Sequence, residues 1–174
     1  GNSNEILPSW SPDSKKIAYV TKTGEMDRTD NYDVYILEID SIDSPIQLTT
    51  NLGADSSSSR PQWSPDGKRI AYLHGGDPAL LWYALQELAV IDLDTKIHSI
   101  LTKELDRNAS SPQWSHDGQN IYFVIEDNMK SQLAQYSLKD QKIKRITPPN
   151  YYISGWSKNY VVRNEKIGLI LSNT

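Results

Sequence analysis

The stretch WSPDGKRIAY at residues 63–72 decides the fold, because the chain repeats it at regular distances. Residues 10–19 have the sequence WSPDSKKIAY, residues 114–123 have WSHDGQNIYF, and a degenerate fourth copy begins at Trp156. Successive tryptophans are separated by 63−10=53, 114−63=51 and 156−114=42 residues. Self-similarity at a period of about 40 to 50 residues indicates a propeller or a solenoid.

Each copy has the composition of two strands joined by a tight turn. In the Ser-Pro-Asp-Gly segment, Pro fixes φ, Asp hydrogen-bonds to the nearby backbone, and Gly adopts a positive φ without steric penalty. The residues after the turn, at 17–20, 70–73 and 121–125, are apolar on both faces of a strand instead of alternating. Such a strand is covered on both sides, and the stacked sheets of a propeller provide that cover.

The predicted fold class is therefore all-β: a partial β-propeller of about three and a half four-stranded antiparallel blades, forming one domain over residues 1–174. The blades are expected at about residues 5–50, 60–102, 111–147 and, incompletely, 152–174. In the fourth blade we expect strands at 152–156 and 166–171, joined by a longer turn that has lost Pro-Asp-Gly. Three tryptophans are expected at equivalent, mostly buried positions of successive blades: Trp10, Trp63 and Trp114.

Connections between the expected strands differ in length on the two sides of the sheets. Strands alternate in direction within a blade, so the first and third connections of each blade emerge on one side and the others on the opposite side. The first kind are all tight turns. The second kind are long, at residues 22–32, 51–60, 74–86, 103–111 and 126–131. Long loops on a rigid scaffold are where binding usually occurs, so a partner is expected on this long-loop side.

Composition excludes several classes of partner. The 174-residue chain has a formal net charge of −4 and no basic run, which argues against binding to nucleic acid or to an anionic membrane. The longest apolar run, at residues 79–85, is too short to span a bilayer, so no membrane insertion is expected. With zero cysteines, disulfides and thiolate metal sites are excluded, but the compartment is not fixed.

Catalytic motifs are absent from the sequence. It contains no G-x-S-x-G segment, no grouping of Ser, His and Asp, and no dinucleotide-binding or phosphate-binding loop. The histidines, His74, His98 and His116, are expected in a loop, a rim strand and a turn that share no face, so a histidine metal site is not expected. We therefore predict no catalytic residue, no metal and no cofactor in this chain.

Two groups of loop residues are candidates for contact with a substrate or a partner. The aromatic pair Trp82-Tyr83 could anchor a partner if it is exposed, or fold back on its own loop. Arginines of the long loops could bind a peptide carboxylate or an acidic partner, or pair with neighbouring acids in a solvated network. The charged candidates are Arg28, Asp30, Arg60, Asp106 and Arg107.

These residues resemble a known family. The Trp-Ser-Pro-Asp-Gly repeat is similar to the TolB-type propeller repeat, which serves many functions. Three further stretches, residues 28–36, 81–91 and 105–115, resemble the N-terminal propeller of the prolyl oligopeptidase family of serine peptidases, in its dipeptidyl-peptidase and acylaminoacyl-peptidase-like branch. That resemblance implies a seven- or eight-bladed propeller that filters peptide substrates for a C-terminal α/β-hydrolase domain. The chain then corresponds to a fragment, with none of the family's catalytic residues.

The leading hypothesis is a non-catalytic, substrate-gating propeller portion of a periplasmic or secreted serine peptidase; a cytoplasmic location is less favoured. Its expected partners are the hydrolase domain of the parent chain and a peptide substrate. A stand-alone TolB-type protein-binding module of the cell envelope is the alternative. A pectate-degrading propeller lyase is a third possibility, but it requires clustered metal ligands that the sequence does not contain.

The ends of an open arc are expected to expose apolar faces. A propeller normally closes on itself, so that no blade leaves a bare face, and about three and a half blades cannot close. Exposed apolar faces of that size usually mark an interface. We therefore expect the isolated chain to form a homodimer of two arcs, with a monomeric arc or a longer parent chain as alternatives.

Overall fold

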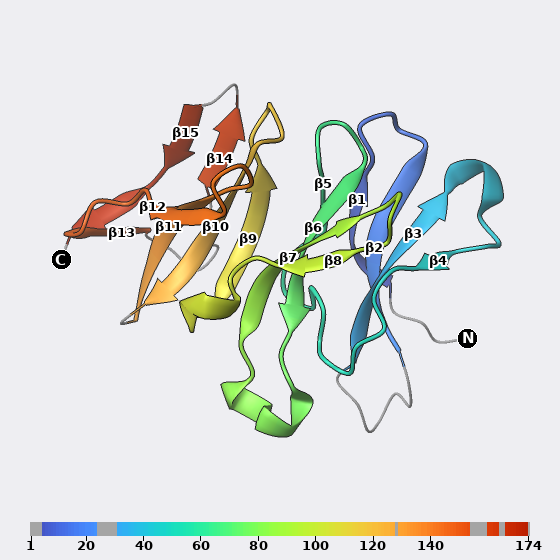
Figure 1. Ribbon diagram of the computed structural model, residues 1–174, viewed down its shortest axis with the longest axis horizontal. Coiled ribbons are helices and arrows are strands. Elements are labelled where there is room, and N and C mark those ends of the chain that lie inside the picture. The colour runs from blue at the N-terminus through green and yellow to red at the C-terminus, as the bar shows by residue number, and fades with distance from the viewer. Residues whose placement is uncertain (1–4, 24–30, 128, 154–159, 164–165, 174) are drawn as a thin grey trace.

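The computed structural model describes residues 5–23, 31–127, 129–153, 160–163 and 166–173. Three four-stranded antiparallel sheets, called blades 1 to 3 here, follow one another along the chain (Figure 1). Blade 1 consists of β1 (Glu5–Trp10), β2 (Lys16–Lys22), β3 (Tyr32–Glu38) and β4 (Ile46–Gln47). Blade 2 consists of β5 (Gln62–Trp63), β6 (Arg69–Gly75), β7 (Gln86–Asp92) and β8 (His98–Ile100). Blade 3 consists of β9 (Ala109–Trp114), β10 (Asn120–Asp127), β11 (Lys130–Ser137) and β12 (Lys142–Arg145).

A fourth unit of two smaller sheets packs against blade 3. In one sheet β13 (Tyr151–Ile153) pairs with β16 (Leu171–Asn173), and in the other β14 (Tyr160–Arg163) pairs with β15 (Lys166–Leu169). Three short 3-10 helices, η1 (Ile39–Ser41), η2 (Pro78–Tyr83) and η3 (Lys103–Leu105), lie in the connections. The described sheets do not close into a ring, which confirms the prediction of an all-β partial propeller.

The fourth unit differs from its expected strands. The single strand expected at residues 166–171 is two strands, because β15 and β16 pair with different partners on either side of the exposed Ile170. Part of the expected long turn is the strand β14, which forms a hairpin with β15. Without Pro-Asp-Gly, the sequence carries no local signal for the position of that hairpin.

Side-chain hydrogen bonds within the repeat explain why its turn recurs. In blade 2 the Ser64 hydroxyl donates to Asp66 Oδ1 at 2.5 Å and accepts from the Arg69 N–H at 2.9 Å. The Asp66 carboxylate also accepts from the Lys68 N–H at 3.0 Å. Blades 1 and 3 repeat the same bonds with Ser11 and Asp13, and with Ser115 and Asp117. These aspartates therefore act as turn formers, as the sequence predicts.

Each blade contributes to a core on both of its faces. Along β6, Ile70 and Tyr72 pack into the core shared with blade 1, while Ala71 and Leu73 pack into the core shared with blade 3. A third core joins blade 3 to the fourth unit through residues such as Leu133. This double coverage is why the strand after each turn is apolar on both faces.

The tryptophans of the repeat connect one blade to the preceding one. Trp63 and Trp114 are each 8% exposed. The Trp63 indole Nε1–H donates to the Ser9 carbonyl at 3.1 Å, and that of Trp114 donates to the Gln62 carbonyl at 2.9 Å. Each acceptor is the residue just before the tryptophan of the preceding blade.

Trp10 corrects the prediction that all three tryptophans are mostly buried, since it is 59% exposed. No described strand packs on its side of blade 1, so neither a core nor a carbonyl acceptor is present there. The free face of blade 1 forms an apolar groove of about 400 Å³ lined by residues such as Ile6, Ile17 and Tyr19.

The long loops lie on one side of the sheets. Figure 1 shows η2 and the connection from β6 to β7 at the lower edge, and the tight turn between β9 and β10 at the upper edge. His74, which was expected in the loop at residues 74–86, is instead part of β6, which extends to Gly75. Among the described residues, no helix is long or apolar enough to cross a membrane.

Candidate functional site

The first strands of successive blades carry a second, shorter repeat. Residues 60–63 have the sequence Arg-Pro-Gln-Trp and residues 111–114 have Ser-Pro-Gln-Trp. Strand β1 contacts β5, and β5 contacts β9, so the first strands lie side by side. In a propeller these strands surround the central channel. Equivalent positions of two blades, Arg60 with Ser111 and Gln62 with Gln113, therefore come to line one cavity.

A β-bulge positions the residues of β9 at this cavity. The pairing of β9 with β10 shifts between Ser110 and Gln113, and the intervening Ser111 has a φ of 53°. Pro112 lacks an N–H and cannot donate to the ladder, which is why the regular pairing is interrupted there. Bulges change the direction of the neighbouring side chains.

A hydrogen-bond network from three segments holds the walls of the cavity. The Gln113 amide donates to the Tyr160 carbonyl at 3.0 Å and accepts from the Val162 N–H at 3.2 Å. The Tyr160 hydroxyl donates to the Ser111 carbonyl at 2.6 Å, and the Ser111 N–H donates to Ser59 Oγ at 3.1 Å. Burial raises the pKa of the Tyr160 phenol well above its ordinary value, so this donor stays protonated at physiological pH.

Arg60 is the cation of this site. The cavity has a volume of about 210 Å³ and is lined by Ser58, Ser59, Arg60, Gln62, Ser111, Pro112, Gln113 and Tyr160. Arg60 is the only charged residue among them. Its side chain is exposed, and its guanidinium has no hydrogen bond or ion pair with the part of the chain that the structure describes. The site therefore combines fixed polar walls with one free cation.

The other predicted site residues do not join Arg60. Arg28 and Asp30 lie outside the described residues, and so does the side chain of Trp82, whose backbone belongs to η2. Tyr83, at the end of η2, is 84% exposed. Its exposure is compatible with a contact to a partner. Within the described ranges, no bond links Arg60 to Tyr83, Asp106 or Arg107.

Asp106 and Arg107 belong to a separate charged network on the long-loop side. Arg107 Nε lies 3.1 Å from Asp127 Oδ1, and its NH1 lies 3.5 Å from Asp106 Oδ2. Arg145 NH2 approaches the other Asp127 oxygen at 2.9 Å. Hydrogen bonds from Arg107 and then Arg145 lower the pKa of Asp127. Arg107 is thus already paired with neighbouring acids. This pairing is the alternative to ligand binding that was left open for the loop arginines.

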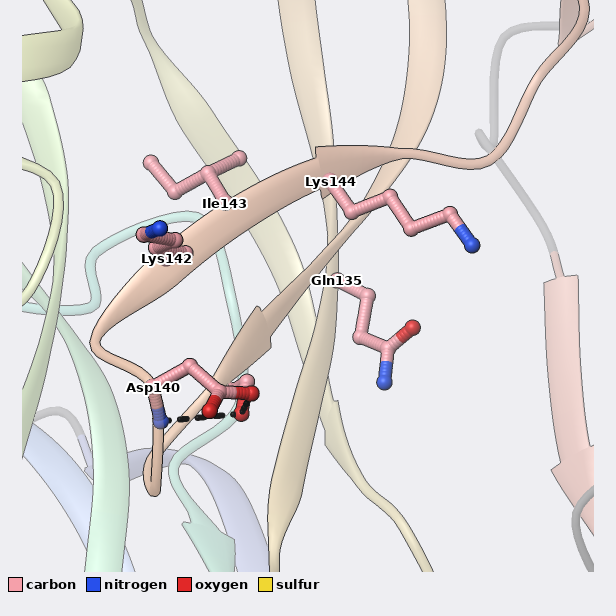
Figure 2. A pocket seen from close by; sticks show the side chains of 6 residues that line it. Gln135, Asp140, Lys142, Ile143 and Lys144 are labelled. Carbon is pink, nitrogen blue, oxygen red and sulfur yellow. Dashed lines mark hydrogen bonds between the residues drawn. The ribbon is translucent and has the colours of Figure 1, made fainter.

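A larger hollow lies on the outer strands of blade 3. It has a volume of about 530 Å³, and Figure 2 shows Lys142 and Lys144 of β12 near Gln135 of β11 and Asp140 of the turn between these strands. Gln135 is on the same face of β11 as Leu133, which is buried against the fourth unit. The hollow is therefore the uncovered outer part of that packing face. It is polar and open, and it lies on the outer strands of the blade 3 sheet, at the opposite end from the first strand β9.

Metal chemistry has no support in the described part of the chain, where no group of three or more His, Asp and Glu side chains could hold an ion. His74 and His98 have other partners there. His74 lies 3.5 Å from the buried Asp55, and His98 Nδ1 lies 3.0 Å from the Tyr72 hydroxyl.

Several lining residues were not among the sequence candidates: Ser58, Ser59, Gln62, Ser111, Gln113 and Tyr160. The recurrence of Pro-Gln-Trp at residues 61–63 and 112–114 is the signal that could have indicated the two glutamines and Ser111. Tyr160 has no such signal, because it belongs to the segment expected as a turn.

Curated relatives with similar sequences are peptidases. The chain is 31% identical over 166 residues to dipeptidyl-peptidase 5 of Porphyromonas gingivalis, an alignment that covers 90% of this chain and 22% of the relative. It is 26% identical to dipeptidyl-peptidase 5 of Trichophyton tonsurans, covering 90% of this chain and 24% of the relative. The chain thus spans about a quarter or less of the length of these relatives.

Solved structures share the fold. A putative TolB of Agrobacterium tumefaciens superposes with a TM-score of 0.72 at 22% identity, over 98% of this chain and 55% of that chain. An acylaminoacyl peptidase of Pyrococcus horikoshii superposes with a TM-score of 0.64 at 16% identity, over 96% of this chain and 28% of that chain. The predicted resemblance is confirmed by these matches. Residues 1–166 also match the TolB beta propeller domain, so the chain belongs to the TolB beta propeller domain family.

Proposed function

We propose that the chain is a non-catalytic propeller portion of a serine peptidase that gates or positions peptide substrates for an α/β-hydrolase domain. The 31% identity to a dipeptidyl-peptidase supports the peptidase context. The observation that carries the positioning role is the cavity between the first strands, where Arg60 has no partner among the described residues. The hydrolase domain of the parent chain and the peptide are parts of this proposal.

The chemistry of the cavity suits a peptide. A peptide presents backbone carbonyls, N–H groups and charged ends, and the cavity offers a guanidinium, hydroxyls and side-chain amides. Arg60 ends the long loop at residues 51–60, so the cavity lies where that loop meets the first strands. Binding on loops held by a rigid scaffold is the common arrangement.

The same residues do not suit covalent catalysis. The lining serines are Ser58, Ser59 and Ser111, and none of the eight lining residues is a His, Asp or Glu. A serine nucleophile needs an adjacent general base to be activated. The arrangement therefore favours binding over catalysis.

Nuclear magnetic resonance can test peptide binding on this chain. The Trp114 indole N–H donates to the carbonyl of Gln62, a lining residue, so its signal reports on the cavity. We expect an acetylated alanine tetrapeptide to shift the Trp114 signal saturably. The Trp10 indole on the free face of blade 1 is the internal control and should not move. Lack of any shift at Trp114 would contradict the proposed function.

A stand-alone TolB-type protein-binding module is the second candidate function. The TM-score of 0.72 to a putative TolB favours it. The reading frame that encodes this chain distinguishes the two candidates. A downstream G-x-S-x-G segment followed by a terminal histidine would establish the peptidase, whereas an end after the last blade would establish the module.

The proposed compartment is the periplasm or the extracellular space in preference to the cytoplasm. This part of the proposal rests on the family resemblance alone, because a chain with zero cysteines is compatible with any of the three compartments.

A further inference from the structure

We propose that the Arg60 cavity is a carboxylate subsite, which binds the C-terminal carboxylate of a peptide. This inference rests on the proposed function and names the group that the cavity recognises. It is drawn from the charge, the size and the rigidity of the cavity.

The charge of the cavity selects for an anion. Arg60 is its only charged lining residue, and its guanidinium has no partner within the described ranges. Three other arginines are engaged: Arg69 lies over the Trp114 ring, and Arg107 and Arg145 bind Asp127. A guanidinium presents a planar fork that matches two carboxylate oxygens. The free cation at the first strands is therefore available for an anionic ligand.

The size of the cavity limits what it can hold. Sites for whole small-molecule ligands usually measure roughly 300–1,000 Å³, whereas this cavity measures about 210 Å³. It accommodates the end of a longer ligand better than a complete one. The terminal residue of a peptide meets this limit. The rest of the peptide would then lie along the channel side of the first strands.

The number of charges favours a carboxylate over a phosphate. Both anions can form paired hydrogen bonds with arginine. A carboxylate carries one negative charge, which the single Arg60 balances. A phosphate monoester carries about −1.5 to −2 at pH 7 and would leave excess negative charge among neutral hydroxyls and amides.

The walls are fixed before a ligand enters. Gln113 is bonded to the backbone on both sides of Val161, and Tyr160 is bonded to the Ser111 carbonyl. The Arg60 guanidinium and the exposed Ser58 hydroxyl have no partner in the described part of the chain, so both are free to meet a ligand. A preorganised site loses less conformational entropy on binding.

A matched pair of peptides tests the inference. Acetylated alanine tetrapeptide is titrated as its free acid and as its C-terminal amide, with the Trp114 indole and Arg60 Nε–H signals followed. We expect the acid to bind roughly tenfold more tightly or better, the gain of a hydrogen bond to a charged group. Arg60→Gln should reduce the affinity for the acid to that for the amide. Arg163→Gln, at another exposed arginine outside the cavity, is the matched control and should change neither.

Each outcome decides between the two proposals. Equal affinity of the wild-type chain for acid and amide would overturn the carboxylate subsite and leave peptide binding intact. Acetate alone is the third probe. If acetate shifts Arg60 but neither peptide shifts Trp114, the cavity binds a carboxylate, but its assignment to a peptide terminus and the proposed function both fail; if no probe shifts either signal, carboxylate binding fails as well. Tighter binding of inorganic phosphate than of the acid peptide would overturn the choice of a carboxylate.

Discussion

Replacing Trp63 by alanine should destabilise the chain strongly, while the same change at Trp10 should have little effect. The two residues begin the same ten-residue repeat, so their local sequence gives no reason for a difference. The difference lies in packing. Trp63 is 8% exposed in the core between blades 1 and 2, and Trp10 is 59% exposed on the free face of blade 1.

The expected magnitudes follow from burial. Removing a buried tryptophan side chain costs about 3–5 kcal/mol, and a chain of this size loses about 2–4 °C in melting temperature per kcal/mol. Trp63→Ala should therefore lower the melting temperature by roughly 6–20 °C. An exposed substitution usually changes stability by no more than about 0.5 kcal/mol, so Trp10→Ala should lower it by no more than about 2 °C.

Trp63→Phe removes the indole hydrogen bond together with a smaller part of the packing than Trp63→Ala does. It keeps an aromatic ring in the core but loses the indole bond to the Ser9 carbonyl, and a net loss of about 1 kcal/mol is expected from that bond. Thermal unfolding by circular dichroism and urea titration measure all three variants. Equal shifts for Trp63→Ala and Trp10→Ala would refute the claim that the repeat tryptophan is stabilised by the preceding blade.

Three further predictions address chemistry, pH and assembly. A fluorophosphonate probe should label no serine stoichiometrically, because the lining serines have no general base beside them; stoichiometric labelling at one serine would contradict this. Hydrogen bonding to Asp55 raises the pKa of His74 in the folded chain. The stability that the protonated His74 contributes is therefore fully present below the unfolded-state pKa of about 6.5, and it is lost as the pH rises through the folded-state pKa. Urea titration from about pH 6 to 8.5 should show this loss, and His74→Asn should abolish it. Light scattering should detect a homodimer of the 19.7 kDa chain; a monodisperse monomer at high concentration would exclude it.

The repeat allowed the fold to be predicted because its turn is determined locally. Ser64 and Asp66 form their hydrogen bonds within a few residues of each other, so the same short sequence gives the same hairpin each time. The fourth unit has lost Pro-Asp-Gly from its sequence, and its strand β14 was expected as a turn. The burial of Trp10 could not be predicted, because burial depends on what packs against the blade and not on the repeat itself.

The candidate site could be predicted only in part. Arg60 was a candidate because it ends a long loop. Four of the other lining residues come from β9 and β14, which are more than 45 residues away (111−60=51 for Ser111). Arg107 was a candidate on the same grounds, yet Asp127, 127−107=20 residues further along, pairs with it. Sequence identifies which residues are charged and lie in loops, whereas tertiary structure determines which of those charges remain unpaired.

The contacts that join blades 2 and 3 are also the contacts that form the cavity. Trp114 donates to the carbonyl of Gln62, and the Ser111 N–H donates to Ser59 Oγ; three of these four residues line the cavity. A ligand that binds there touches both blades and the Tyr160 segment at once. Because a ligand stabilises the state that it binds, occupation of the cavity must also favour the docked arrangement of these blades. The proposed binding of a ligand and the docking of the blades would thus be coupled through the same few residues.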